Sequence, residues 1–260
     1  MIRNEQNNLT YYRFATLDHP SLVQAVFTRL GGRSSAPFDS LNVGQSIGDE
    51  PIAVQNNLDL VYKALGLQAN QIVTAHQVHG RRVTRVDSYA GGAVIADTDA
   101  LVTSSTGKYL LMRYADCVPV LLWDPEHSAI GLVHAGWQGT LKQVTKAAVE
   151  RMVTEFNSQP DVLRAGIGPA IGPCCFEVGP EVVANVQAAL PDALKVLSQR
   201  TQDGHAHLDL WTANRGQLER CGVRQIRVAE KCTCCHQDEF YSHRGSGGRT
   251  GRFAVIIGLR

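Results

Sequence analysis

The chain has 260 residues, of which 44% are hydrophobic and 19% charged, proportions that are typical of a folded globular protein and exclude a largely disordered one. Its formal net charge of +1 provides no general field that would attract nucleic acid or an anionic membrane surface. The N-terminal residues lack the apolar core of a signal peptide, and the longest apolar stretch is too short to span a bilayer, so we expect a cytoplasmic protein with neither nucleic acid nor membrane as a partner.

Short apolar runs and a few helical patterns alternate along the chain, with no repeat and no low-complexity linker. Runs rich in Val, Ile, Leu and Thr predict strands at Val23–Thr28, Gln71–His76, Arg82–Val86, Asp99–Thr103, Tyr109–Arg113, Val118–Asp124, Ala129–His134, Val162–Gly168, Gln225–Ala229 and Phe253–Ile257. Helical spacing predicts helices at Ala53–Leu65, Thr140–Phe156, Pro180–Ala189 and Leu208–Cys221, the second of them with Thr140 as its N-terminal cap. We therefore expect one domain over residues 1–260, of the α+β or α/β class.

Three motifs place a histidine or a cysteine at the end of a predicted strand: AHQVHG at 75–80, YADCVPV at 114–120 and GLVHAGWQGT at 131–140. Imidazole and thiolate together suit zinc or copper, and three protein ligands would leave one coordination position open, as in catalytic sites. Cys117 and His134 are separated by enough chain for a strand, a turn and an antiparallel return strand, so both could reach one edge of a sheet. Spacing alone leaves open that these are ordinary hydrogen-bonded histidines and a buried cysteine.

The two histidines of the first motif differ in their fitness as ligands. His76 and His79 are three residues apart, and an odd offset along a strand points side chains to opposite faces. Only one of them is therefore expected to join the other two donors. We prefer His79, because it precedes Gly80 at the predicted turn.

The motifs QVHG (77–80), ADCVPVLL (115–122), HAGWQGT (134–140) and GPAIGPCCFEVG (168–179) together resemble those of the YfiH family of laccase-domain proteins. This family is also described as multi-copper polyphenol oxidoreductases and as purine nucleoside phosphorylases. FTRLGG (27–32) and FYSHRGSGGRTGR (240–252) extend the resemblance towards both ends of the chain. The resemblance implies a fold of two mixed β-sheets packed face to face with helices outside, and a metal held by His79, Cys117 and His134.

The activity that the resemblance implies is a zinc enzyme acting on purine nucleoside and phosphate. It would phosphorolyse adenosine, inosine, guanosine or methylthioadenosine-type nucleosides and would also deaminate adenosine. One alternative is a copper-dependent polyphenol oxidase. The other is a cysteine hydrolase of a cell-wall precursor amide, with Cys117 as nucleophile and His134 as base, since a His paired with a Cys is also an arrangement for acyl attack. Oligomeric state is left open.

Several residues within the matching motifs are candidates for substrate contacts. Arg29 and Arg244 have the fork geometry that suits phosphate. Asn42 could bind ribose or shape a turn, and Asp116 could orient a ligand or exchange a proton. Cys175 lies in a loop rich in Gly and Pro, and a structural role remains open for it.

Two positions depart from the family pattern, and one segment lies largely outside it. Gln138 replaces the usual Arg or Lys after the Trp of HAGW, and His243 replaces the first Arg of SYRRDG, so we expect substrate preference to be affected more than metal binding. The segment KCTCCHQ (231–237) gathers Cys232, Cys234 and Cys235, and these thiols are expected to be buried or incidental, whereas a structural role is expected for Cys174.

Overall fold

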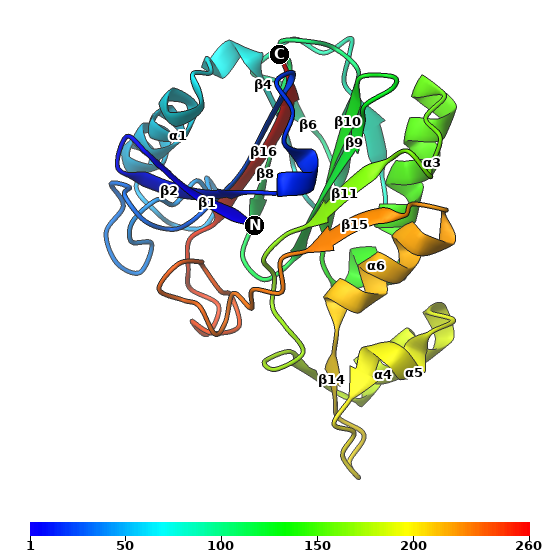
Figure 1. Cartoon of the computed structure of the whole chain (residues 1–260). Helices are drawn as coiled ribbons and strands as arrows, with labels where there is room; N and C mark the ends of the chain where they lie inside the picture. The colour runs from blue at the N-terminus through cyan, green and yellow to red at the C-terminus, as the bar shows by residue number, and fades with distance from the viewer.

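The computed structural model describes all residues 1–260, and two large β-sheets pack face to face with helices on their outer sides (Figure 1). The first sheet contains, in spatial order, β1 (Ile2–Gln6), β2 (Leu9–Arg13), β3 (Leu22–Phe27), β16 (Phe253–Leu259), β8 (Tyr109–Tyr114), β4 (Ile72–Ala75) and β6 (Val94–Ile95). The second sheet contains β15 (Gln225–Val228), β11 (Arg164–Ile167), β9 (Val118–Asp124), β10 (Ala129–Ala135), β7 (Ala100–Thr103) and β5 (Val83–Arg85). A small third sheet contains β12 (Glu177–Val178), β14 (Ala206–Leu208) and β13 (Leu197–Ser198).

Both large sheets combine parallel and antiparallel pairs, so the α+β class and the layering implied by the family resemblance are confirmed. Every strand predicted from the sequence is present within a few residues of its predicted bounds. The N-terminal hairpin of β1 and β2, the short β6 and the small sheet were not predicted. β1 is largely polar and exposed, and β6, β12 and β13 are two residues long, so none of these shows a hydrophobic period in the sequence.

The helices are α1 (Pro51–Leu65), α2 (Trp137–Leu141), α3 (Val144–Phe156), α4 (Pro180–Ala189), α5 (Ala193–Val196) and α6 (Leu210–Arg220), with single 3₁₀ turns at Ala15–Leu17 and Ala69–Gln71. α1 begins at a proline in its first turn and ends at Gly66 in the left-handed conformation, the two strongest sequence signals for helix ends. None of the helices combines the length with the apolar composition that crossing a bilayer requires.

The predicted helix at 140–156 begins at the wrong residue. Gln143 adopts the left-handed conformation with φ of 62°, which separates α2 from α3, and Thr140 lies inside α2 instead of capping a helix. The Thr140 hydroxyl accepts a hydrogen bond from Asn214 of α6 at 3.0 Å. The break lets α2 start directly after the HAG motif, so Trp137 and Gln138 remain beside the end of β10.

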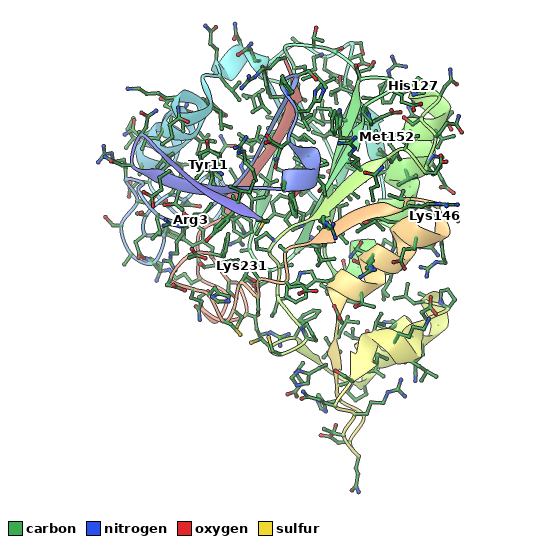
Figure 2. The ribbon with its side chains drawn as sticks, in the orientation of Figure 1. Arg3, Tyr11, His127, Lys146, Met152 and Lys231 are labelled. Carbon is green, nitrogen blue, oxygen red and sulfur yellow. The ribbon has the colours of Figure 1, made fainter.

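Three apolar layers hold the sheets and helices together. Leu110 and Val255 of the first sheet meet Leu121 and Leu132 of the second in the cluster between the sheets. A further cluster joins α1 to the outer face of the first sheet, and the largest joins α3 and α6 to the outer face of the second. In Figure 2, Met152 of α3 points towards the second sheet. Each such fully buried side chain stabilises the fold by about 1.5 to 3 kcal/mol.

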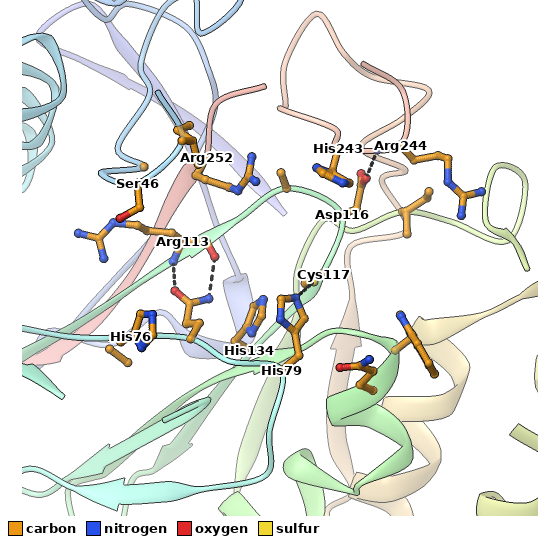
Figure 3. A pocket seen from close by; sticks show the side chains of 18 of the residues that line it. Ser46, His76, His79, Arg113, Asp116, Cys117, His134, His243, Arg244 and Arg252 are labelled. Carbon is orange, nitrogen blue, oxygen red and sulfur yellow. Dashed lines mark hydrogen bonds between the residues drawn. The ribbon is translucent and has the colours of Figure 1, made fainter. Parts of the chain in front are cut away.

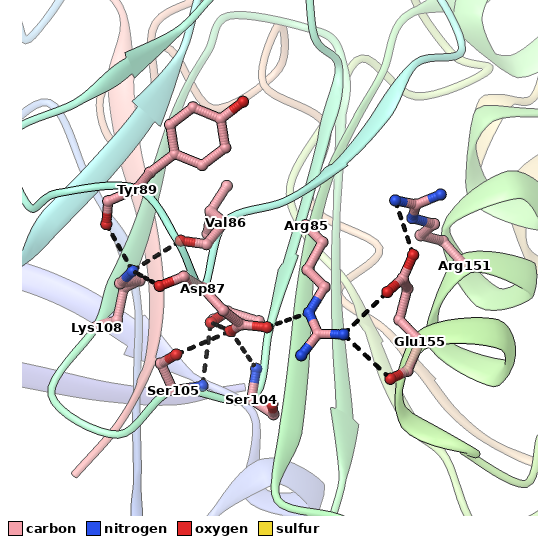
Figure 4. A network of polar contacts seen from close by, with 10 residues as sticks. Arg85, Val86, Asp87, Tyr89, Ser104, Ser105, Lys108, Arg151 and Glu155 are labelled. Atoms are coloured by element: carbon pink, nitrogen blue, oxygen red, sulfur yellow. Dashed lines mark hydrogen bonds and ion pairs between the residues drawn. The ribbon is translucent and has the colours of Figure 1, made fainter.

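A polar network fixes the outer edge of the second sheet to α3 (Figure 4). The Asp87 carboxylate accepts hydrogen bonds from Arg85, Thr103 and Ser105, while Arg85 Nη1 also donates to Glu155 at 2.9 Å. Burial alone would raise the pKa of Asp87, but these hydrogen bonds lower it to about 2. The loop after β5 is therefore held by a carboxylate that stays ionised over a wide pH range.

The chain crosses from the first sheet to the second in the short turn between β8 and β9. Tyr114, the last residue of β8, spans the same gap, because its hydroxyl donates to the carbonyl of Val133 on β10 at 2.9 Å. Cys117 lies in this turn. The end of the sandwich at which the chain crosses is consequently where residues of both sheets meet.

Candidate active site

His79, Cys117 and His134 come together at this end of the sandwich, with their ligand atoms all within 4.8 Å of one another. His79 follows β4 in a loop, Cys117 lies in the turn between the sheets, and His134 is near the end of β10. His79 Nε2 lies 3.7 Å from Cys117 Sγ, and the two imidazole rings meet edge to face with centroids 4.9 Å apart. Figure 3 shows the three side chains converging.

Strand pairing explains why two of these residues are neighbours. β9 and β10 are antiparallel, with His134 opposite Pro119 and Ala135 opposite Val118, so Cys117 lies next to the end of β10. This is the arrangement of strand, turn and return strand that the sequence predicted for Cys117 and His134. The residue after Ala135 also has to lack a side chain. A Cβ atom at Gly136 would lie 2.8 Å from His79 Cδ2 and 2.9 Å from Cys117 Sγ, which explains the glycine of HAGW.

His76 takes no part in this group. Its Nδ1 lies 3.0 Å from the carboxylate of Asp97, and both side chains are more than two thirds exposed. Of the two histidines of AHQVHG, only His79 lies with Cys117 and His134, as the offset along the chain predicted. His79 has a positive φ of 58°, which turns its side chain away from the direction of β4.

Asp99, which the sequence indicated only as the start of a strand, holds the ring of His134 and the backbone of the loop that carries His79. Its fully buried carboxylate accepts hydrogen bonds from the backbone N–H of Val78 at 3.2 Å, of His79 at 2.9 Å and of Gly80 at 2.7 Å. The same group lies 2.8 Å from His134 Nδ1. With Nδ1 bonded to Asp99, the other ring nitrogen of His134 is free to face Cys117. Burial acts to raise the pKa of Asp99, but the hydrogen bond from His134 and those from the loop lower it.

The charges of the cysteine and the buried histidine depend on each other. Burial would raise the pKa of Cys117, but the neighbouring imidazoles of His134 and His79 lower it to about 6. Burial would likewise lower the pKa of His134, but Cys117 and Asp99 raise it to about 9. The protein alone thus favours a thiolate beside an imidazolium, and a metal cation would replace the proton in stabilising the thiolate.

Asp116 has a positive φ of 82° and a side chain whose two oxygens are both engaged. One oxygen accepts a hydrogen bond from the hydroxyl of Thr233 at 2.6 Å, and the other from the backbone N–H of Arg244 at 2.7 Å. Its backbone carbonyl accepts from Ile171 at 2.9 Å. These contacts favour an orienting role for Asp116 over exchange of a proton.

A cavity of about 760 Å³ opens directly onto the three donors, a volume suited to a small-molecule ligand. Its lining is strongly basic for a chain with almost no net charge. The basic residues around it are His76, His79, His134, His243, Arg113, Arg244 and Arg252, whereas Asp116 is the only acidic one. Trp137, Ile171 and Phe176 add apolar surface. In Figure 3, Arg113 and Arg252 lie on one side of the donors, and His243 and Arg244 on the other.

The arginines of the pocket differ in how many of their N–H groups are free. Arg113 is held by the carbonyl of Val43 at 2.7 Å and the hydroxyl of Thr74 at 2.8 Å, which favours a structural role. Arg252 uses Nη1 alone, on the carbonyls of Thr250 and Gly251. Arg244 likewise uses Nη1, on the carbonyl of Glu177 at 2.9 Å. The Nε and Nη2 groups of Arg244 and Arg252 make no hydrogen bond within the protein. Arg244 was predicted to contact substrate from the sequence, whereas Arg252, the last residue of the same motif, was not.

Three of the predicted substrate-binding residues do not line the cavity. Arg29 donates to the carbonyls of Asp39 and Gln237 and stacks over Tyr241, which ties loops together. The fully buried Asn42 closes a turn, since its Oδ1 accepts from the N–H groups of Gly44 and Arg252. Cys175 faces Cys235 instead, at 3.4 Å. The two departures from the family pattern, Gln138 and His243, do line the cavity.

Cys174, Cys175, Cys232 and Cys235 form a second group, with all four sulfur atoms within 4.8 Å of one another. Cys232 and Cys235 were expected to be buried or incidental thiols. Cys232 is buried and Cys235 is exposed, and the fold brings both close to Cys174 and Cys175. Cys232 and Cys235 also have the C-x-x-C spacing, which went unrecognised in the sequence, and the adjacent pair Cys174 and Cys175 faces them from another loop. Cys234 is not a member of the group.

The donor set of His79, Cys117 and His134 fits a transition metal. Thiolate and imidazole are ligands of zinc and copper, three such ligands would leave one coordination position open, and all three residues line the cavity.

Known proteins share the fold and the sequence over nearly the whole chain. The family model described as multi-copper polyphenol oxidoreductase laccase matches residues 23–260. Purine nucleoside phosphorylase YlmD of Geobacillus stearothermophilus is 37% identical over 247 residues, which cover 92% of this chain and 90% of that protein.

Two solved structures are similar over almost their full length. The crystal structure of YlmD from Geobacillus stearothermophilus has a TM-score of 0.93 at 34% identity and covers 99% of this chain and 98% of that one. The Bacillus licheniformis hypothetical protein YfiH has a TM-score of 0.89 at 32% identity and covers 96% of this chain and 99% of that one. The chain therefore belongs to the YfiH and YlmD family of laccase-like proteins.

Proposed function

We propose that the chain is a zinc-dependent purine nucleoside phosphorylase that also deaminates adenosine. The observation that carries the proposal is a single cavity that presents both the three-donor group and two arginines with free N–H groups. The name of the relative from Geobacillus stearothermophilus supports the nucleoside and phosphate as substrates. Adenosine, inosine, guanosine and methylthioadenosine-type nucleosides are the substrates to test.

The residues of the cavity supply what phosphorolysis needs. Phosphate has to be held as an anion beside the ribose, and the free Nε and Nη2 groups of Arg244 and Arg252 offer the fork geometry that binds phosphate oxygens. The purine base has apolar and aromatic surface available at Trp137, Ile171 and Phe176. As phosphate oxygen bonds to the anomeric carbon, the bond from that carbon to the base nitrogen breaks, and the base leaves with the electron pair.

His79, Cys117 and His134 would hold the zinc ion, and Asp99 would keep the ring of His134 and the backbone of His79 in position. When bound, zinc supplies Lewis-acid chemistry that suits the hydrolytic loss of the 6-amino group of adenosine. The Gln138 and His243 side chains line the same cavity, so they are the residues that we expect to tune the choice of nucleoside.

A substrate panel tests this function directly. Chelator-treated protein is compared with zinc-restored and copper-restored protein, and release of free base, release of ammonia and oxidation of phenols are measured in parallel. We expect base release only with phosphate and ammonia release only with zinc. Phenol oxidation by the copper-restored form alone would favour the polyphenol oxidase that the family description names. Reduction of oxygen to water commonly needs several coppers, however, and the chain has no second histidine-rich group.

One observation favours a second candidate, a cysteine hydrolase. Cys117 Sγ lies within 4.8 Å of a ring nitrogen of the buried His134, and the neighbouring imidazoles lower the pKa of the thiol, an arrangement that suits a cysteine nucleophile with its base. A chelated protein would keep this activity, and a zinc enzyme would lose it. Hydrolysis of cell-wall precursor amides by metal-free protein would therefore establish the second candidate in place of the first.

A further inference from the structure

The four cysteines Cys174, Cys175, Cys232 and Cys235 come from two loops that are far apart in sequence. The first two lie in the loop that leads into β12, and the other two follow β15. Their sulfur atoms are 3.5 Å apart for Cys174 and Cys235, and 3.4 Å apart for Cys175 and Cys235. Four thiolates around zinc, each about 2.3 Å from the ion in a tetrahedron, lie about 3.8 Å from one another. The observed spacing is therefore close to that of a four-cysteine site, and it is too long for a disulfide bond.

The backbone around the group is arranged as in metal sites. The N–H of Gly172 donates to Cys232 Sγ at 3.2 Å. Bonds of this kind orient a sulfur ligand and stabilise its charge. The two loops also pair directly, because Ala170 and Cys232 form a parallel bridge and the N–H of Thr233 donates to the carbonyl of Ala170. These two contacts hold the loop that carries Cys232 beside the segment that leads to Cys174 and Cys175.

We propose that Cys174, Cys175, Cys232 and Cys235 bind a zinc ion with a structural role, separate from the site of His79, Cys117 and His134. Four thiolates complete a tetrahedron and leave no open position, which is the structural arrangement. The ion would join the two loops at the edge of the cavity. Neighbours of the cysteines reach the candidate active site, since Thr233 and Ile171 both hydrogen-bond to Asp116, and Arg244 Nη1 bonds to Glu177 next to Phe176.

Zinc counting by native mass spectrometry tests the proposal. We expect about two zinc ions per wild-type chain and about one in the variants C235S and C232S. C234S removes a thiol from the same loop that is not a member of the group, and C221S removes a distant one at the end of α6, so both controls should keep two. His134→Ala should also fall to one, because it affects only the other site. If C235S and wild type carry equal zinc, the proposal is wrong.

A measurement on wild-type protein serves if the variants fail to fold. Cys174 and Cys235 are exposed, so an alkylating reagent can reach both sulfur atoms once they are free thiols. We expect both to be protected in protein as purified and to become reactive after chelation, while the reactivity of Cys221 stays unchanged. Equal rates before and after chelation would overturn the proposal, as would a disulfide within the group or iron with acid-labile sulfide bound there.

Discussion

Replacement of Asp99 by Asn should weaken both the metal site and the fold. Asn keeps the shape of Asp but presents an NH₂ group in place of one oxygen. One carboxylate oxygen accepts from the N–H groups of Val78 and Gly80, and the other from His79 and His134. Whichever way the amide of Asn is turned, its NH₂ group therefore faces two N–H donors and can accept a hydrogen bond from neither. The site is fully buried, so no water replaces the lost acceptor.

The expected magnitude follows from these two lost hydrogen bonds. A hydrogen bond to a charged group contributes about 1.5 to 3 kcal/mol, so the free energy of unfolding should fall by about 3 to 6 kcal/mol. Loss of a partner that orients a ligand commonly lowers metal affinity by about 10- to 100-fold. Urea unfolding measures the first quantity, and competition with a chromogenic chelator measures the zinc affinity of the folded variant.

Asp97→Asn is the matched control, because Asp97 lies two residues away and contacts only the exposed His76. An exposed ion pair contributes about 0 to 1 kcal/mol, so this variant should resemble wild type in both assays. A folded Asp99→Asn protein with wild-type zinc affinity would refute the view that Asp99 positions the histidines.

Three further changes test other parts of the site and the fold. Cys117→Ser should lose the zinc of the active site and all activity together, and zinc retained at the wild-type level without activity would move the cysteine hydrolase to first place. Arg252→Gln should raise the KM for phosphate by roughly 10- to 100-fold through the loss of charge-assisted hydrogen bonds, whereas Arg29→Gln, outside the cavity, should leave that KM unchanged. The folded pKa of Asp87 is depressed from 3.8 to about 2, so its stabilising contribution is present above pH 4 and is lost as the pH falls towards 2. Asp87→Asn should therefore flatten the dependence of urea-unfolding stability on pH in that window, and an unchanged slope would contradict the role of the network.

Local chemistry in the sequence was enough to predict the central strands and to nominate the three donors, but the family resemblance was needed to select them as metal ligands. A histidine or cysteine at the end of an apolar run predicts a side chain at the edge of a sheet. Cys117 and His134 are also joined by two consecutive antiparallel strands, so their proximity depends only on nearby sequence. Asp99 could not be recognised in the same way, because its partners at Val78–Gly80 are brought to it by the packing of a loop. An aspartate before a strand is too common to indicate such a role.

The cysteine group shows the same limit more clearly. The spacing of Cys232 and Cys235 is visible in the sequence, but two ligands alone do not make a metal site. The second pair, Cys174 and Cys175, is more than fifty residues away, and only the pairing of Ala170 with Cys232 brings the two loops together. The left-handed conformation of Gln143, which divides the predicted helix, likewise could not be recognised in the sequence, because Gln is not a residue that favours positive φ.

The position of the candidate metal centre follows from the crossing of the chain between the two sheets. His79 belongs to the loop of a strand in the first sheet, His134 belongs to the second, and Cys117 lies in the turn that joins them. A metal ion bound by all three would therefore connect the sheets at the end where Tyr114 already bonds to Val133. Binding to the folded state alone stabilises it by about 2.7 kcal/mol when free metal exceeds its dissociation constant a hundredfold. Because the three ligands are far apart in an unfolded chain, metal affinity and the docking of the two sheets depend on each other, and a change that loosens either should weaken both.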